Sequence, residues 1–312
     1  MHKSKHNKIG ARYYTIFVLL LGAYIYAAVN APKQASAYKL SSTATAVLTI
    51  ALLVPIIAIW LTGVYGAVRF KQYAWRIRTY EDGRGMMHLA NGLLLLSYGT
   101  MLTSLFSTLA GYQTLSSVSY RAFIIASGYL TVAVLACTFY LLYKGAQLLR
   151  SQLKPSQREV SEETSLAATA ITIILATSYA AALFTYPYRN TSADPINHHS
   201  FFLNDGWLLS TLVFPTVLIW GLGIKAVVDL RAYQQHVQGT TYRQIFQSLS
   251  TGLSMVLAFF IMLTLLNTVS ELATGVSLKV AVVIVYILLA FYALGFVIIA
   301  RGAKKLSLIE DV

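Results

Sequence analysis

The sequence alternates long apolar runs with short polar connections. Runs long enough to cross a membrane occupy residues 13–29, 44–68, 89–110, 122–143, 165–186, 207–228, 249–270 and 280–300. Each is close to the roughly 20 residues that an α-helix needs to span ~30 Å of hydrocarbon. Because lipid offers the backbone no hydrogen-bond partners, such runs fold as helices. The pattern predicts an all-α, polytopic membrane protein with eight transmembrane helices.

The second half of the sequence repeats the first. "VPIIAIW" begins at Val54 and "FPTVLIW" begins at Phe214, an offset of 160. The same offset relates Gly63/Gly223, Tyr73/Tyr233, Leu89/Leu249, Gly92/Gly252 and Thr108/Thr268. An offset of 157 relates Tyr129/Tyr286, Phe139/Phe296, Lys144/Arg301 and Gly145/Gly302. We therefore predict two four-helix transmembrane repeats, residues 1–155 and 156–312. Because four is even, the repeats are parallel and related by a pseudo-twofold axis along the membrane normal.

Each repeat places a proline inside an apolar run. Pro55 and Pro215 each remove one helix hydrogen bond, which predicts a kink near the middle of the membrane. Trp60 and Trp220 follow less than two turns later, deeper than the interfacial aromatic belt, so we expect them to pack beside the bends. The repetition makes the kink a structural device used once in each half.

Composition and charge agree with a membrane location. The chain of 312 residues is 57% hydrophobic and 11% charged, whereas soluble domains carry about 25% charged residues. The net charge of +13 comes mostly from Lys and Arg in alternate loops, on the side of both termini. The positive-inside rule then places both termini in the cytoplasm of a multi-pass protein in the cell (cytoplasmic) membrane. The charge is thus a topology signal and does not indicate nucleic-acid binding.

The N-terminus has a competing interpretation. Its basic start, apolar run and Ala35-Ser36-Ala37 fit a cleavable signal peptide. The repeat gives the first run a counterpart, which favours a retained helix.

A polar row recurs in both repeats and forms the candidate cavity lining. Its members share one helix face in the outer half of the membrane, and they are Ser104, Ser107 and Thr108 in the third run and Thr264, Asn267 and Thr268 in the seventh. Glu271 lies at the outer end of the same face. The row predicts either polar walls of a cavity between the repeats or hydrogen bonds to neighbouring helices and to the helix backbone.

One pair of opposite charges lies within a run. Lys225 and Asp229 are four residues apart and share a helix face near the cytoplasmic end, which predicts an intramembrane ion pair. The other interpretation is a lysine that extends its charge to the interface beside an interfacial aspartate.

No motif predicts catalysis, a cofactor or a metal. Asp194, His198, His199 and Asp205 share the longest outer loop, but adjacent histidines in an extended segment point apart. The function that the pattern favours is a permease or channel for a small solute at the seam between the halves. The alternative is a non-catalytic membrane scaffold or accessory subunit, with membrane-protein partners or a second copy of the chain; an enzyme is the least supported class.

Overall fold

A computed structural model describes the backbone of residues 2–30, 42–110, 117–153, 169–174, 206–237, 239–272 and 278–309. Within these ranges it describes the side chains of residues 10–27, 53–80, 82–106, 129–153, 169–174, 214–237, 239–265 and 283–306. Every regular element in these residues is an α-helix. The long helices are α1 (His2–Asn30), α2 (Ser42–Arg76), α3 (Glu81–Ala110), α4 (Ser117–Ser151), α8 (Gly206–His236), α9 (Thr240–Leu272) and α10 (Leu278–Ile309). Residues 169–174 form a short further helical segment.

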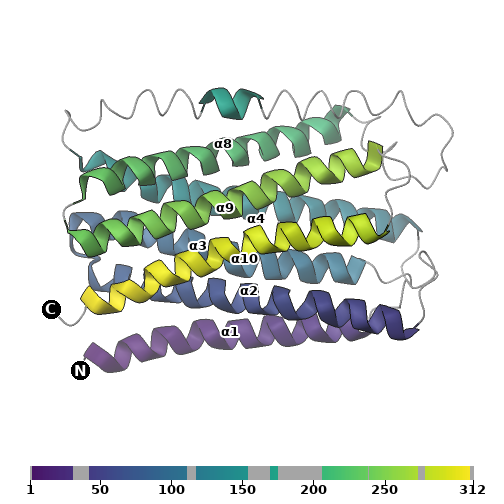
Figure 1. Ribbon diagram of the computed structural model, residues 1–312, viewed down its shortest axis with the longest axis horizontal. Helices are drawn as coiled ribbons and strands as arrows, with labels where there is room; N and C mark the ends of the chain where they lie inside the picture. Colours follow the sequence, from purple (N-terminus) through teal and green to yellow (C-terminus); the bar gives the residue numbers. More distant parts are fainter. Residues whose placement is uncertain are drawn as a thin grey trace.

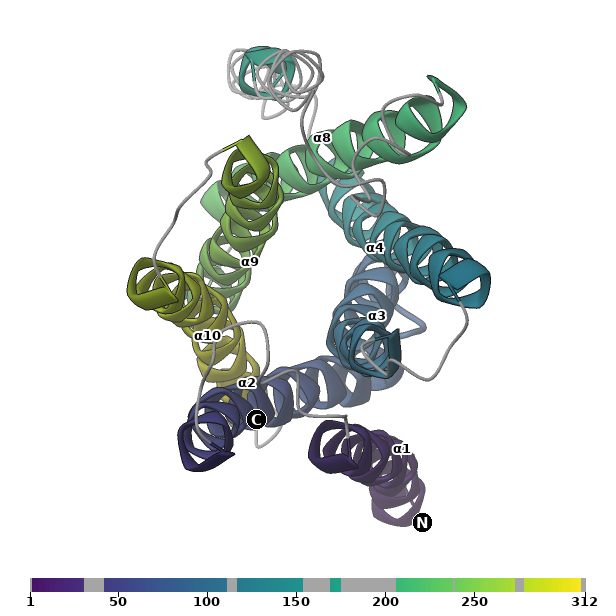
Figure 2. The same cartoon turned by 90° about the vertical axis from the view of Figure 1, so that its right-hand side faces the viewer.

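The long helices run side by side as a bundle (Figure 1). Six of them form a closed ring in the order α2, α3, α4, α8, α9, α10 and back to α2, and each packs on the next (Figure 2). Helix α1 lies outside this ring against α2 and α3. The N-terminus of α1 and the end of α10 lie at the same end of the bundle (Figure 1), as expected if both termini share one side of a membrane.

Six helices are long and apolar enough to cross a membrane. Their spans are Gly10–Ala27, Leu53–Arg76, Asp82–Phe106, Tyr129–Ser151, Thr240–Leu265 and Val283–Leu306. A chain with this many apolar helices has the architecture of a helical integral membrane protein. Helix α8 is not among the six within the described residues, and the predicted fifth run is described only at 169–174, so the count of eight stays a prediction.

Two helices extend past the apolar runs. Helix α2 continues to Arg76 and α8 continues to His236. Pro55 and Pro215 lie inside these helices, which are continuous on both sides of each proline. The residues Glu-Asp-Gly at 81–83 predict a turn from the sequence, but the chain turns at residues 77–80 and Glu81 already begins α3. A glycine just past a helix predicts its end at Gly239; α8 does end before this residue, which adopts a positive φ of 100° that favours glycine.

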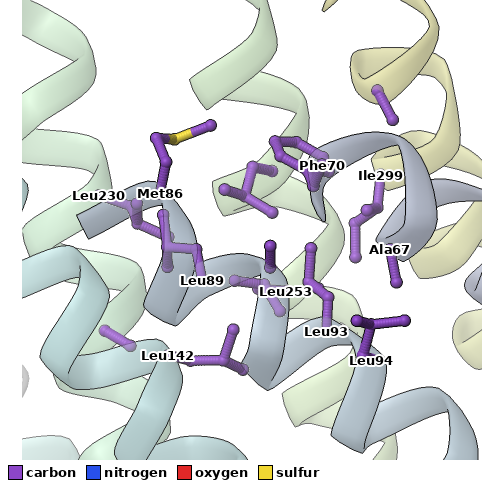
Figure 3. Packing of buried hydrophobic residues seen from close by; sticks show 14 of the residues in the cluster. Ala67, Phe70, Met86, Leu89, Leu93, Leu94, Leu142, Leu230, Leu253 and Ile299 are labelled. Atoms are coloured by element: carbon purple, nitrogen blue, oxygen red, sulfur yellow. The ribbon is translucent and has the colours of Figure 1, made fainter. Parts of the chain in front are cut away.

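The core fills the space between the ring helices (Figure 3). It contains Leu89 and Leu93 of α3, Leu142 of α4, Leu253 of α9 and Ile299 of α10. Trp60 and Trp220 are 2% and 1% exposed, so both rings are packed inside the bundle. Since lipid is as apolar as leucine, close van der Waals packing holds such helices together more than the hydrophobic effect does.

Candidate functional site

The predicted polar row is described only in part. Ser104 of α3 and Thr264 of α9 are half-buried. The Thr264 hydroxyl donates to the carbonyl of Phe260 in its own helix at 2.8 Å. Thr264 thus makes a hydrogen bond to the helix backbone, which is the second of the two interpretations of the polar row. The other predicted cavity-lining side chains lie outside the described residues: Ser107, Thr108, Asn267, Thr268 and Glu271. The cavity lining therefore stays a prediction.

Aromatic side chains meet inside the ring instead, and we call them the aromatic layer: Phe139 of α4, Phe259 and Phe260 of α9, and Tyr292 and Phe296 of α10. The Phe259 ring stacks on Tyr292 with centroids 4.4 Å apart, and the Tyr292 ring meets Phe296 edge to face at 4.9 Å. Phe139 meets Phe260 edge to face at 6.2 Å. Helices α4 and α9 are not neighbours in the ring order, so this last contact crosses its interior.

A hydrogen bond crosses the ring at the aromatic layer. The Tyr292 hydroxyl donates to the Thr100 hydroxyl of α3 at 3.0 Å, and Tyr292 is 5% exposed. A buried phenol needs such a partner because an unpaired hydroxyl in an apolar interior is costly. The sequence places Thr100 beside the polar row, but nothing in it indicates a tyrosine partner 192 residues further along the chain.

Two glycines allow the rings of the aromatic layer to approach the helices. A Cβ atom on Gly63 of α2 would lie 2.7 Å from Cε1 of Phe296, and one on Gly223 of α8 would lie 3.0 Å from Cδ1 of Phe139. Both distances are shorter than ordinary van der Waals contact. The ring edges therefore fill space that only a residue without a side chain leaves open.

Two polar contacts cross the ring at the end of the bundle where α2 and α8 end and where α3 and α9 begin. We call these two contacts the tyrosine clasp. The hydroxyls of Tyr73 in α2 and Tyr242 in α9 are hydrogen-bonded. The Tyr233 hydroxyl of α8 donates to the Asp82 carboxylate of α3 at 3.2 Å. Tyr73 and Tyr233 are 4% and 8% exposed, whereas Asp82 and Tyr242 are half-buried. Each contact joins helices that are not neighbours in the ring order.

The environment of Tyr233 favours the donor role. Burial, followed by the negative charge of Asp82, raises the pKa of the Tyr233 phenol well above its usual range, so the phenol keeps its proton at physiological pH. Its ring also meets Phe246 edge to face, with centroids 4.9 Å apart. The clasp thus combines polar tips with apolar ring packing.

Asp229 pairs with a residue that the sequence alone does not single out. Nη1 of Arg150 in α4 lies 2.7 Å from Oδ1 of Asp229 in α8. The Asp229 side chain is 2% exposed and that of Arg150 is 19% exposed. This ion pair ties α4 to α8, and the predicted pair between Lys225 and Asp229 stays a prediction. Arg150 falls in the last turn of α4, and nothing in the sequence indicates that α4 packs on α8 there.

We also searched the described residues for a metal site and compared the chain with known proteins. Within the residues that the structure describes, no three His, Cys, Asp or Glu side chains are grouped to hold a metal. The loop with Asp194, His198, His199 and Asp205 lies outside those residues. Comparison with known proteins finds no matching family model, no matching curated protein and no matching solved structure.

Proposed function

We propose that the chain consists of two four-helix units, residues 1–155 and 156–312, with eight spans and a pseudo-twofold axis through the helix ring. The ring order supports this, because α2, α3 and α4 are followed by α8, α9 and α10 in the same succession. The clasp supports it further. Tyr73 and Tyr233 are related by the offset of 160, and so are Asp82 and Tyr242. Exchanging the units therefore converts the contact of Tyr73 with Tyr242 into that of Tyr233 with Asp82.

The glycine contacts follow the same rule. Gly63 and Gly223 are related by the offset of 160, and the rings that they meet, Phe296 and Phe139, by the offset of 157. These are the two offsets that relate the repeats in the sequence. A duplicated unit explains why each unit supplies the glycine for the other unit's phenylalanine.

For orientation, we propose that both termini lie in the cytoplasm of a cell carrying this protein in its cytoplasmic membrane. The clasp lies at the end of the bundle where α2 and α8 end and where α3 and α9 begin. Under the positive-inside rule this end faces the cytoplasm.

On this framework the protein functions as a permease or channel for a small, uncharged or weakly polar solute that passes along the axis of the ring. The observation that carries this proposal is the pair of barriers across the ring, the aromatic layer in the middle and the tyrosine clasp at one end. A bundle that needs only stability gains little from polar contacts between non-neighbouring helices, whereas a gate needs contacts that can open. The structure then corresponds to the closed state.

The alternative is a non-catalytic scaffold or accessory subunit of a membrane complex. The observation that favours it is the apolar filling of the ring interior by large buried side chains such as Trp60, Trp220 and Phe296. In that case the chain binds another membrane protein or a second copy of itself through its lipid-facing surface.

The direct test is solute flux into proteoliposomes, measured by osmotic swelling with a panel of small uncharged solutes. The substitution pair Phe139→Ala and Phe296→Ala opens the aromatic layer and is expected to raise flux at least tenfold above that of the native chain. Tyr140→Ala in the lipid-exposed face of α4 serves as the matched control and leaves flux unchanged.

Two outcomes contradict the transport proposal. Unchanged flux in the Phe139→Ala, Phe296→Ala protein for every solute removes the aromatic layer as a barrier. If a stable membrane-protein partner also copurifies with the native chain, the scaffold function is favoured over transport. The variant with Thr108→Val and Thr268→Val tests the polar row in the same assay, and unchanged flux there removes the row from the mechanism.

A further inference from the structure

Three basic side chains from successive helices lie near one another: Lys71 of α2, His88 of α3 and Lys144 of α4. We call them the basic triad. The Lys71 ammonium, in a residue that is 9% exposed, donates to Asn91 and to Sδ of Met87 on α3. The positive charges of Lys71 and Lys144 both act on the His88 ring. The two ammonium groups therefore concentrate positive charge at one place beside α3.

Within the described residues, no carboxylate pairs with the triad. The Lys144 ammonium contacts Gln147 at 3.5 Å, and Lys71 has only an amide oxygen and a thioether, which is a weak acceptor. Nδ1 of His88 is buried without a hydrogen-bond partner. An ammonium has three N–H donors, so Lys71 retains one for a further acceptor. By contrast, the buried charge of Asp229 meets Arg150 directly.

A buried cation without a counter-ion is costly, and an anion that binds beside it removes much of that cost. The triad offers what an anion with several oxygens requires: two ammonium groups and an imidazole donor, held by three helices. A phosphoryl group has this shape and charge.

The triad also lies at the depth of lipid headgroups. Lys71 is five residues before the end of α2, His88 is seven after the start of α3, and Lys144 is seven before the end of α4. At ~1.5 Å per residue, all three are within about 10 Å of the helix ends. One turn further into the membrane on α4, Tyr140 is 53% exposed, so an acyl chain finds apolar surface next to Lys144.

We propose that Lys71, His88 and Lys144 bind the phosphoryl group of an anionic phospholipid, whose acyl chains lie along the exposed apolar face of α4. The site is at the junction of α2, α3 and α4, which pack in succession. Its ligand is a phosphoryl anion, and the adjoining apolar surface favours a lipid over free phosphate. The proposal does not depend on transport along the ring axis.

The chain provides a matched control in its second part. Arg231 and Ser248 correspond to Lys71 and His88 at the offset of 160, and Arg301 corresponds to Lys144 at the offset of 157. In contrast to Lys71, both arginines are exposed on the surface of the bundle. Arg231 donates to Ser254 at 3.2 Å, and Ser248 donates to the carbonyl of Gln244 in its own helix. These residues have comparable charge but no buried cation and no histidine.

The test is native mass spectrometry of the full chain in detergent, titrated separately with phosphatidylglycerol, phosphatidylcholine and inorganic phosphate. We expect one phosphatidylglycerol to bind at least tenfold more tightly than phosphatidylcholine. Lys71→Gln with Lys144→Gln should weaken that binding about 25-fold, at roughly fivefold for each positive charge removed. Arg231→Gln with Arg301→Gln should change it less than twofold.

Four results would overturn the proposal. Equal affinity for the two lipids shows no selectivity for the anion. Equal weakening by the control pair shows general attraction to surface charge. Binding of inorganic phosphate without a preference for phosphatidylglycerol shows that the ligand is a free phosphoryl compound. If the double variant fails to fold, Lys144→Gln alone replaces it, since among the described residues the Lys144 ammonium hydrogen-bonds only to Gln147 of its own helix; a loss below twofold then contradicts the site.

Discussion

The two parts of the ring, α2–α4 and α8–α10, have similar packing and different polar chemistry. Where the first part has Trp60 and Gly63, the second has Trp220 and Gly223, and the two tryptophans are almost equally buried, at 2% and 1% exposed. At the clasp, however, the carboxylate of Asp82 in one contact takes the place of the Tyr242 phenol in the other. The comparison teaches that the two parts share these large packing residues but differ in their polar groups. Functional asymmetry is therefore to be sought in the polar groups.

The largest expected effect concerns the framework. Trp60→Ala and Trp220→Ala each remove a fully buried ring, and we expect each to lower the free energy of unfolding by about 3–5 kcal/mol. Thermal unfolding in detergent measures this, with Tyr140→Ala as the exposed control. Because equivalent sites relax to a similar extent, the free energies of unfolding of the two variants should fall by similar amounts. We expect the two decreases to agree within about 2 kcal/mol, the range over which the cost of one type of large-to-small substitution varies between sites. A larger difference between the two tryptophan variants would show that the two parts of the ring are not packed equivalently at these positions.

The next prediction concerns a feature without a counterpart. Asp229 corresponds to Arg69 at the offset of 160, so the matching position of α2 lacks the carboxylate of this ion pair. Arg150→Gln leaves the buried Asp229 carboxylate without its partner and should cost about 3 kcal/mol. Arg69→Gln changes an exposed arginine and should cost less than about 0.5 kcal/mol. Equal Tm values for the two variants would show that the pair contributes nothing to the junction.

A smaller effect is expected from overpacking. Gly63→Val and Gly223→Val place side-chain atoms where the rings of Phe296 and Phe139 lie. Each should cost about 1–3 kcal/mol, because a well-packed core relaxes only partly around added atoms. The second substitution Phe296→Leu should recover part of the loss of Gly63→Val, but not of Gly223→Val. Recovery of both, or of neither, would contradict these contacts.

The smallest effect distinguishes the two clasp contacts. Tyr233→Phe removes a hydrogen bond to a carboxylate and should cost about 2 kcal/mol, whereas Tyr73→Phe removes one between neutral phenols and should cost about 1 kcal/mol. Tm measurements at pH 7 compare them directly. A larger loss for Tyr73→Phe would show that the clasp asymmetry does not follow the charge of Asp82.

Much of the fold is predictable because apolar runs of membrane length leave the backbone only one regular structure. The helical class follows from that constraint. The turn at residues 77–80 could not be predicted, because the sequence "EDG" with Gly83 is typical of a turn and indicates one at residues 81–83 instead. In the structure it lies in the first turn of α3, where a Cβ would meet the carbonyl oxygen of Ile77 at 2.1 Å.

The candidate site is less predictable. Sequence patterns single out polar residues inside apolar runs, whereas the contacts across the ring come mainly from aromatic rings, whose role depends on which helices face one another. Tyr73 and Tyr233 match at the offset of 160, but their hydrogen-bond partners Tyr242 and Asp82 lie on helices that local periodicity cannot pair. In the sequence, Arg150 is only one of the basic residues that set the topology. Long-range helix packing decides each of these contacts.

The measurement that tests the central claim most directly is chemical cross-linking across the ring. In a Cys137→Ser background, cysteines replace Tyr73 and Tyr242 in one variant and Asp82 and Tyr233 in another, and both are treated in membranes with a short thiol-specific bifunctional reagent. The two-unit ring predicts that both pairs cross-link at similar rates, because exchanging the units interconverts them. Cross-linking of only one pair, or of neither, would contradict the pseudo-twofold arrangement.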